Sequence, residues 1–201
     1  MKSAQRFSTI VEGLLLVSLA LLIESVFPDD ITARAIPLRV GLSLLLLYAF
    51  RRGPLAGFAA GFIFGGLNAW LIMPESYGSW PIILAMGGIG LALGVASLFA
   101  RNLQRTLHNK RMKSVYLNLV TGTVLSLLLY FAGELVINRW LFDLNALPLS
   151  TQLRVTAVGF AFNLVLSLVI LILLLNIQSK YFIPKNTPYI SRKERSRLLN
   201  D

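Results

Sequence analysis

The sequence predicts an all-α polytopic membrane protein with six transmembrane helices and both termini in the cytoplasm. Of its 201 residues, 56% are hydrophobic and only 14% are charged. Six apolar stretches approach the roughly 20 residues that a helix needs to cross a bilayer core about 30 Å thick. Basic residues gather in alternate connections between these stretches. This composition excludes the soluble globular and the disordered classes of protein.

The six stretches follow one another with short connections, so we expect a single transmembrane domain. The first could be mistaken for a secretory signal, but VFPDDITARAIPLR leads directly into the next apolar run and contains no small-residue cleavage site. We therefore predict a retained helix, a domain spanning residues 1–180 and a basic cytoplasmic tail at 181–201. The predicted spans are roughly 8–27, 33–50, 54–73, 80–100, 115–138 and 153–177.

The distribution of Lys and Arg predicts the orientation in the membrane. With six spans, all but four of the 19 basic residues fall on the side that holds both termini. Short loops rich in Lys and Arg stay in the cytoplasm, so the termini are expected there. These charges lie at helix ends without a folded soluble domain, so they favour anionic lipid headgroups or a cytoplasmic partner over nucleic acid. The four exceptions are Arg34, Arg39, Arg139 and Arg154.

The third span opens with RRGPLAGFAAGFIFGG, which carries a glycine at every fourth position. Small residues at this spacing let a neighbouring helix approach closely inside the bilayer. We expect the stripe to pack against another helix of the chain, such as the glycine-rich MGGIGLALGVASLF, or against another subunit. The residues of the stripe are Gly53, Gly57, Gly61 and Gly65.

Ionisable residues inside the predicted spans are candidates for function, because such groups are costly at membrane depth unless they are paired or face water. Glu12 lies near the cytoplasmic end of its span and is expected to reach the headgroups. Glu24, Arg39 and Glu134 lie toward the external ends of their spans. They could form an internal ion pair between Arg39 and one glutamate, or they could face a ligand.

Aromatic and amide side chains accompany these charges on the external side. Trp80 and Trp140 suit an interfacial aromatic belt, yet a ligand with a flat ring would use the same groups. Asn163 is polar within an apolar span, where a hydrogen bond between helices is its common use.

The sequence offers no support for catalysis. His108 is the only histidine, it lies in the basic stretch RNLQRTLHNKRMK, and there is no cysteine. We therefore predict no metal site, no disulfide and no cofactor. The chain also lacks a G-x-S-x-G turn and a phosphate-binding loop, so we predict that it is not an enzyme. If it transports a solute, the energy comes from an ion gradient or from another polypeptide.

Two long runs carry a resemblance to a known family. AIPLRVGLSLLLLYAFRRGPLAGFAAGFIFGGLNAWL, followed by WPIILAMGGIGLALGVASLFAR, resembles the substrate-binding S components of energy-coupling factor vitamin transporters, closest to the thiamine-binding branch. The likeness covers roughly residues 10–177. It implies six helices in a bacterial plasma membrane, an externally facing vitamin pocket, a membrane-embedded coupling protein and two cytoplasmic ATPases.

The resemblance also implies positions for the pocket. Trp140 and Asn163 match an aromatic and an amide position of that branch. Either the ligand differs from thiamine, or Glu24 and Glu134 take over from new positions, because three positions expected to be Glu, His and Tyr are apolar. These three are Ala85, Ala132 and Val158.

The first span carries the family's small-residue docking motif only in part. Gly13 is present, but Val17 follows it where alanine is expected. Gly13 is therefore grouped with the glycine stripe as a candidate for helix packing or subunit docking.

Two functions remain open from the sequence. The first is capture of a small vitamin or vitamin precursor, thiamine-like by preference, for uptake. The second is a ligand-free membrane scaffold or assembly protein with the same fold. For the first, the candidate ligand-binding residues are Glu24, Arg39, Trp80, Glu134, Trp140 and Asn163.

Overall fold

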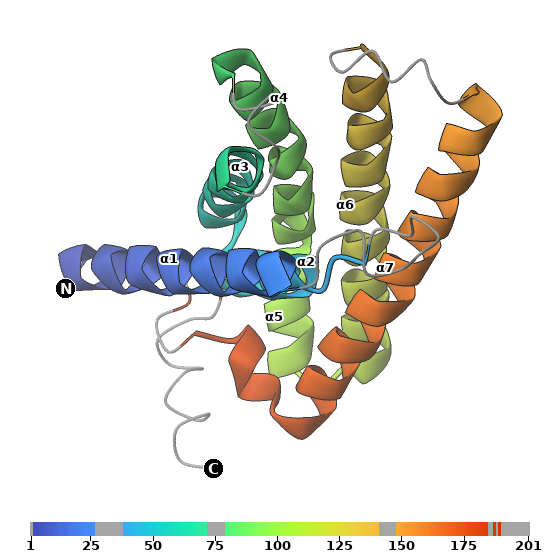
Figure 1. The fold of residues 1–201 in the computed structure, drawn as a ribbon. Helices are drawn as coiled ribbons and strands as arrows, with labels where there is room; N and C mark the ends of the chain where they lie inside the picture. Colours follow the sequence, from blue (N-terminus) through green and yellow to red (C-terminus); the bar gives the residue numbers. More distant parts are fainter. Residues whose placement is uncertain are drawn as a thin grey trace.

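The computed structural model describes residues 2–26, 38–71, 79–140, 148–184, 187 and 189, and the regular structure within them is helical (Figure 1). The elements are α1 (Lys2–Val26), α2 (Gly41–Arg52), α3 (Pro54–Leu71), α4 (Trp80–Gly90), the 3₁₀ helix η3 (Leu91–Phe99), α5 (Ala100–His108), α6 (Met112–Trp140), α7 (Leu149–Ile177) and the 3₁₀ helix η4 (Ser179–Phe182).

Six helical rods correspond to the six predicted spans, because α4, η3 and α5 follow one another without a break. Five of the rods are long and apolar enough to cross a membrane. The sixth, α2, begins at Gly41, and positions 33–37 of its predicted span lie outside the described residues. The apolar runs thus locate every rod, whereas the rod boundaries differ from the predicted ones.

The largest difference concerns the basic stretch 101–113, which the sequence suggested to be a loop containing His108. The helix continues through α5 to His108, and α6 begins at Met112, so the connection is only three residues long. Leu103 and Leu107 are buried one turn apart, and this apolar face keeps the polar stretch helical.

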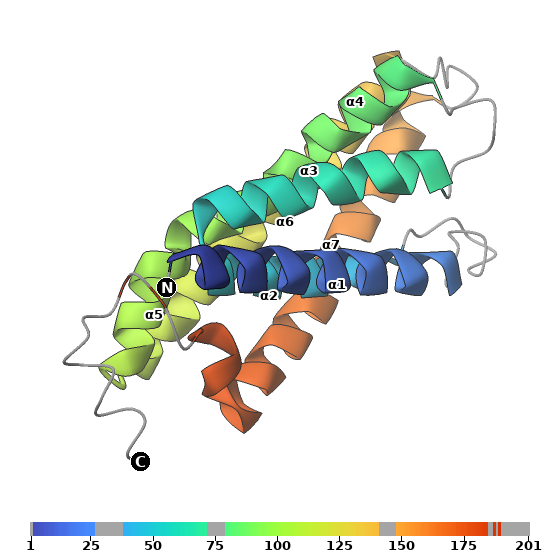
Figure 2. The same cartoon turned by 90° about the vertical axis from the view of Figure 1, so that its left-hand side faces the viewer.

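Helix α2 lies at the centre of the fold. It contacts α1, α3, η3, α5 and α7, and most of its residues are buried. Helix α1 runs across the direction of α4 and α6 in both views (Figures 1 and 2). The apolar residues of α2 are thus enclosed by the neighbouring helices.

Helix α3 packs closely on the α4–η3 rod. A side chain at Gly61 would clash with the carbonyl oxygen of Gly90, and one at Gly90 would clash with that of Gly61. Gly65 lies in the same way against the carbonyl of Met86, and Gly57 faces Ser97 on η3. Backbone approach of this kind is how small residues bring helices together in lipid.

Gly53 has a different role from the rest of its stripe. It ends α2 with a φ of 87°, a region that residues with a side chain rarely adopt, and α3 begins at the next residue. The first glycine of the stripe therefore forms the turn between α2 and α3 instead of the α3 packing face.

Candidate functional site

The candidate site is built around the beginning of α2. The inward face of α1 carries Val17, Ala20 and Glu24, and the backbone of Gly41 approaches this face so closely that an added Cβ would lie 2.8 Å from the carbonyl oxygen of Ala20. At this contact the N–H of Gly41 donates to Oε1 of Glu24 over 3.1 Å. Glu24 thus caps α2, whose N-cap residue Val40 makes no capping bond with its own side chain.

Arg39 lies two residues before α2 and extends its side chain to α6. Its Nη2 lies 2.5 Å from Oε1 of Glu134, and its Nη1 donates to the hydroxyl of Tyr130 over 2.5 Å. The guanidinium carbon also lies 5.6 Å from the centre of the Tyr130 ring, within cation–π range. Tyr130 and Glu134 are four residues apart on α6 and therefore share one helical face.

Asn163 on α7 holds the backbone of the same residue. The N–H of Arg39 donates to Oδ1 of Asn163 over 2.7 Å, and Nδ2 of Asn163 donates to the carbonyl of Gly159 over 2.8 Å. Residues from three rods and from the segment before α2 thus meet in one place. We call Glu24, Arg39, Tyr130, Glu134 and Asn163 the Arg39 cluster.

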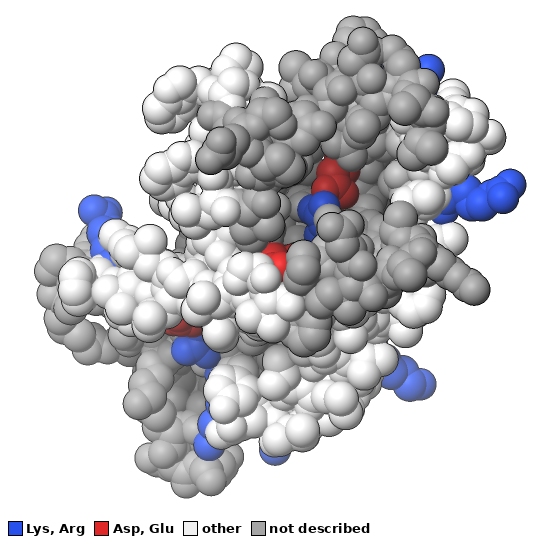
Figure 3. All heavy atoms as spheres, in the orientation of Figure 1, with Lys and Arg blue, Asp and Glu red and all other residues white. Residues whose placement is uncertain are grey.

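All five residues of the Arg39 cluster are buried. Burying charges is tolerated only when they are paired and hydrogen-bonded, so the geometry explains how Arg39 and Glu134 coexist in an apolar bundle. Figure 3 shows acidic and basic atoms next to each other in a hollow of the molecular face. The sequence left open an ion pair with one glutamate, and the structure places it at Glu134.

Of the two tryptophans of the predicted site, Trp80 does not join the cluster. Trp80 begins α4 and its side chain is 77% exposed, as expected of a residue in an interfacial aromatic belt. Trp140 ends α6, and its side chain lies outside the described part of the structure.

Gly13 faces the interior of the chain. A Cβ at this position would lie 2.6 Å from the hydroxyl of Tyr48 on α2. Val17 is buried on the same face of α1. This face packs against α2 and also lines a groove between α1 and α3, so subunit docking at Gly13 stays a prediction.

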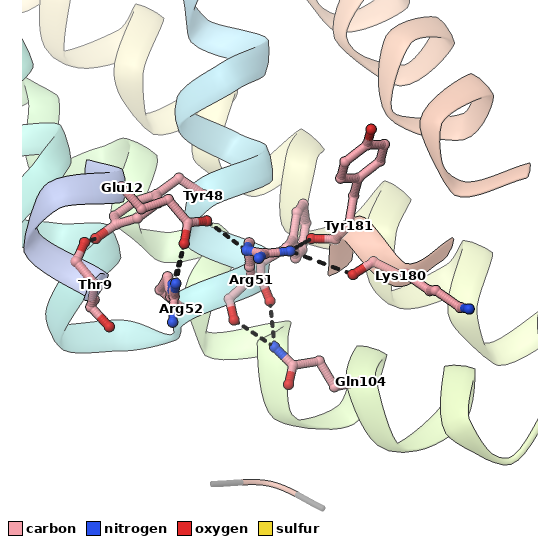
Figure 4. Close-up of polar contacts among 9 residues, drawn as sticks. Thr9, Glu12, Tyr48, Arg51, Arg52, Gln104, Lys180 and Tyr181 are labelled. Atoms are coloured by element: carbon pink, nitrogen blue, oxygen red, sulfur yellow. Dashed lines mark hydrogen bonds and ion pairs between the residues drawn. The ribbon is translucent and has the colours of Figure 1, made fainter. Parts of the chain in front are cut away.

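A second charged cluster lies at the other end of α2. Oε1 of Glu12 on α1 lies 2.5 Å from Nε of Arg51, and its Oε2 binds Arg52 (Figure 4). Nη1 of Arg51 also donates to the carbonyl of Tyr181 over 2.6 Å. The expectation that Glu12 reaches the lipid headgroups stays a prediction, and the structure adds that two arginines of α2 lie close enough to bind its carboxylate. We call these residues with Tyr181 the Glu12 cluster.

The described part of the tail packs beside this second cluster. Gln104 on α5 is fully buried, and its Nε2 donates to the carbonyls of Phe50 and Arg51 over 2.9 Å. Its Oε1 accepts a hydrogen bond from Thr187 over 2.5 Å. The Tyr189 hydroxyl lies against Gly53, where burial raises the pKa of Tyr189.

Two grooves flank the half of α1 that carries Glu12. One, of about 1100 Å³, lies between α1 and α3 and is lined mainly by apolar residues such as Leu14, Ala59 and Ile63. The other, of about 650 Å³, lies on the opposite flank beside Leu15 and Tyr181. Together they leave this half of α1 as an exposed apolar ridge.

A family model described as thiamine transporter protein (Thia_YuaJ) matches residues 10–183. The chain belongs to this family. A solved structure, ThiT from Listeria monocytogenes, is similar with a TM-score of 0.73 and 20% sequence identity, over 90% of this chain and 100% of that chain. No curated protein sequence matches the chain.

Membership of the thiamine transporter family confirms several predictions together. The chain is a multi-pass membrane transport protein and not an enzyme, and its resemblance to the thiamine-binding branch is confirmed. The likeness to the solved structure confirms the predicted polytopic all-helical fold. Within the described residues no group of His, Cys, Asp and Glu side chains could hold a metal ion.

The three apolar positions that the resemblance singled out do not belong to the Arg39 cluster of this thiamine transporter family member. Ala132 and Val158 are exposed and Ala85 is half-buried. Ala132 is two residues from both Tyr130 and Glu134, so it points away from the face of α6 that they share. A polar group at Ala132 or Val158 would thus not replace Glu134 within the cluster.

Tyr130 belongs to the Arg39 cluster but was not among the candidate ligand-binding residues predicted from the sequence. Its phenol is buried and contacts Arg39 by both its hydroxyl and its ring. The signal was present in the four-residue spacing between Tyr130 and Glu134, which places an aromatic ring next to an intramembrane acid on one helix face.

Proposed function

We propose that this protein captures thiamine, or a closely related cationic heteroaromatic vitamin, at the Arg39 cluster for uptake into the cell. The observation that carries this proposal is the Glu134 carboxylate, which lies buried beside the Tyr130 ring in a member of the thiamine transporter family. A carboxylate next to an aromatic face is the pair of features that a flat organic cation needs.

Specificity at such a site follows from the cost of leaving Glu134 without a cation. A neutral vitamin that displaced the Arg39 guanidinium would leave a buried carboxylate uncompensated, which costs several kcal/mol. Thiamine carries a permanent positive charge in its thiazolium ring and avoids this cost. We therefore expect cationic ligands to be selected over neutral ones of similar size.

Calorimetry on the purified protein tests this proposal against thiamine, its pyrimidine precursor, pyridoxine, pantothenate and riboflavin. We expect thiamine to bind, because it carries the permanent positive charge, and Glu134→Gln to weaken that binding at least tenfold. Glu12→Gln is the matched control, because it removes the acid of the other cluster and should leave ligand affinity unchanged. Mass spectrometry of small molecules that copurify with the protein gives an independent reading. If no ligand of the panel binds and none copurifies, the ligand-free scaffold is the better account.

We further propose that the protein works as an S component, with a membrane-embedded coupling protein and two cytoplasmic ATPases as its partners. The chain contains no motif for nucleotide hydrolysis, and partner ATPases would supply energy that the chain does not provide by that route. The grooves on the two flanks of α1 offer a concave surface into which a helix of the coupling protein could pack within the bilayer.

Affinity purification after coexpression with these partners tests the assembly. Leu14→Trp fills the larger groove and is expected to reduce recovery of the coupling protein. Leu173→Trp adds the same bulk at an exposed position on α7 and serves as the matched control. Equal recovery with both variants would place the docking surface elsewhere.

A further inference from the structure

The Arg39 guanidinium occupies the position that a cationic ligand would need. It lies 2.5 Å from a carboxylate oxygen of Glu134 and 5.6 Å from the centre of the Tyr130 ring. An organic cation would be attracted to the same carboxylate and the same ring face. Two positive groups cannot share this place without repulsion, so Arg39 and such a ligand exclude each other.

The way Arg39 is attached permits an exchange. Its backbone N–H is fixed by Asn163 on α7, whereas its guanidinium is held by two residues of α6. Rotation about the side-chain bonds of Arg39 can therefore remove the guanidinium from Glu134 while the start of α2 stays in place, because Asn163 and Glu24 each accept a hydrogen bond from a backbone N–H at the start of α2.

We propose that Arg39 is a built-in substitute for the ligand's cation, which neutralises Glu134 in the empty site and is displaced when the ligand binds. This inference rests on the proposed function. It makes Arg39 a competitor of the ligand and not a residue that binds it. One positive charge replaces another, so Glu134 is compensated in both states. Arg39 thus lowers the affinity for the ligand, and it stabilises the protein while the site is empty.

The energetic consequence is that ligand affinity is reduced by the free energy of the Arg39 contacts. Apparent affinity falls by the fraction of molecules in which the binding position is open. A change that weakens the hold on Arg39 should therefore strengthen ligand binding, as expected for a ligand that selects the open state. A residue that contacts the ligand directly would show the reverse behaviour.

The experiment measures thiamine affinity by calorimetry in wild type, Arg39→Gln and Arg39→Lys, each checked for a monodisperse peak in detergent. We expect Arg39→Gln to bind at least tenfold more tightly than wild type, because no cation competes for Glu134. Arg39→Lys keeps a competing charge and should remain closer to wild type. Unchanged or weaker binding by Arg39→Gln overturns the inference.

Tyr130→Phe gives a second reading that does not depend on the folding of Arg39→Gln. It removes the hydroxyl that binds Nη1 of Arg39 and keeps the ring, so we expect binding to strengthen a few-fold. Tyr116→Phe is the matched control, because Tyr116 donates to Asn176 on the exposed surface, away from Arg39. Weaker or unchanged binding by Tyr130→Phe counts against displacement.

The outcomes separate this inference from the proposed function. Binding by wild type with no gain in either variant overturns the role of Arg39 and leaves the site standing. Binding by Arg39→Gln alone supports Arg39 as the competing cation. Absence of binding in wild type and in every variant overturns both.

Discussion

The two ends of α2 carry charged clusters made from the same residue types but in different surroundings. At its beginning, the side chains of Arg39 and Glu134 are 10% and 9% exposed. About 18 Å away, at its end, those of Arg51 and Glu12 are both 23% exposed. Arg39 and Glu134 are thus nearly enclosed by the protein, whereas Arg51 and Glu12 are partly exposed where α1, α2 and the segment after α7 meet.

The comparison teaches that burial decides what an ion pair can do. In the Arg39 cluster, loss of one partner leaves a charge without compensation, so the pair responds strongly to anything that replaces a partner. In the Glu12 cluster, water and a second arginine can compensate a loss, so that pair mainly fastens helices.

Breaking the buried pair should cause the largest loss of stability. We expect Glu134→Leu to lower the free energy of unfolding by about 3–5 kcal/mol, because it leaves the Arg39 guanidinium buried without its carboxylate. The double variant Arg39→Met with Glu134→Leu removes both charges and should recover most of this loss. Unfolding in mixed detergent micelles measures both quantities. A double variant as unstable as the single one would show that the charge is not the cause.

The close contact between α3 and the α4–η3 rod should be the next most sensitive to mutation. We expect Gly61→Leu to destabilise the protein by about 1–3 kcal/mol, because the added side chain meets the backbone of Gly90. Thermal unfolding in detergent measures the change. Gly88→Leu is the control, because a Cβ there would meet no atom within 4 Å. Equal stability of both variants would show that α3 and α4 can separate freely.

Removing the carboxylate of the Glu12 cluster should have a smaller effect. We expect Glu12→Gln to cost about 1 kcal/mol, since the pairs are only partly buried. The difference from wild type should shrink as salt is raised from low ionic strength to about 1 M, where the Debye length is about 3 Å. The same salt change should leave the cost of Glu134→Leu nearly constant. Equal salt dependence at both positions would mean that their surroundings do not differ.

The orientation of the chain in the membrane can be tested with variants that should not change its stability. We predict from the basic residues that Asn109 faces the cytoplasm and Ser79 faces outside. Cysteines introduced at these two positions into a chain without cysteine should react with impermeant reagents from opposite sides of intact cells. Labelling of Asn109→Cys from outside would show that the chain has the opposite orientation to the one predicted from its basic residues.

Local sequence pattern predicted the helical rods and the ionisable residues within them that are costly to bury. Apolar runs predicted the spans, and the intramembrane acids pointed to Glu24 and Glu134 because such groups are rare at that depth. The glycine spacing likewise indicated a close helix contact on α3.

The pairings themselves were not predictable from local pattern. Arg39 and Asn163 are 124 residues apart, and only the three-dimensional packing of α7 beside the start of α2 brings them together. Arg51 and Arg52 looked like cytoplasmic flanking charges, and nothing local showed that Glu12 would bind both. The helicity of residues 101–108 was missed because basic residues obscured the buried face formed by Leu103 and Leu107.

The continuous rod from Trp80 to His108 has a mechanical consequence. Its nine 3₁₀ residues rise about 2.0 Å each and its other twenty about 1.5 Å, so the rod is about 48 Å long. That exceeds a bilayer core of about 30 Å, so the rod has to tilt or project beyond the core. A rigid rod of this length acts as a lever arm: a change in tilt of about 10° moves its far end by about 8 Å. Small rotations inside the membrane would thus be amplified at α5, where Gln104 touches both the end of α2 and the tail.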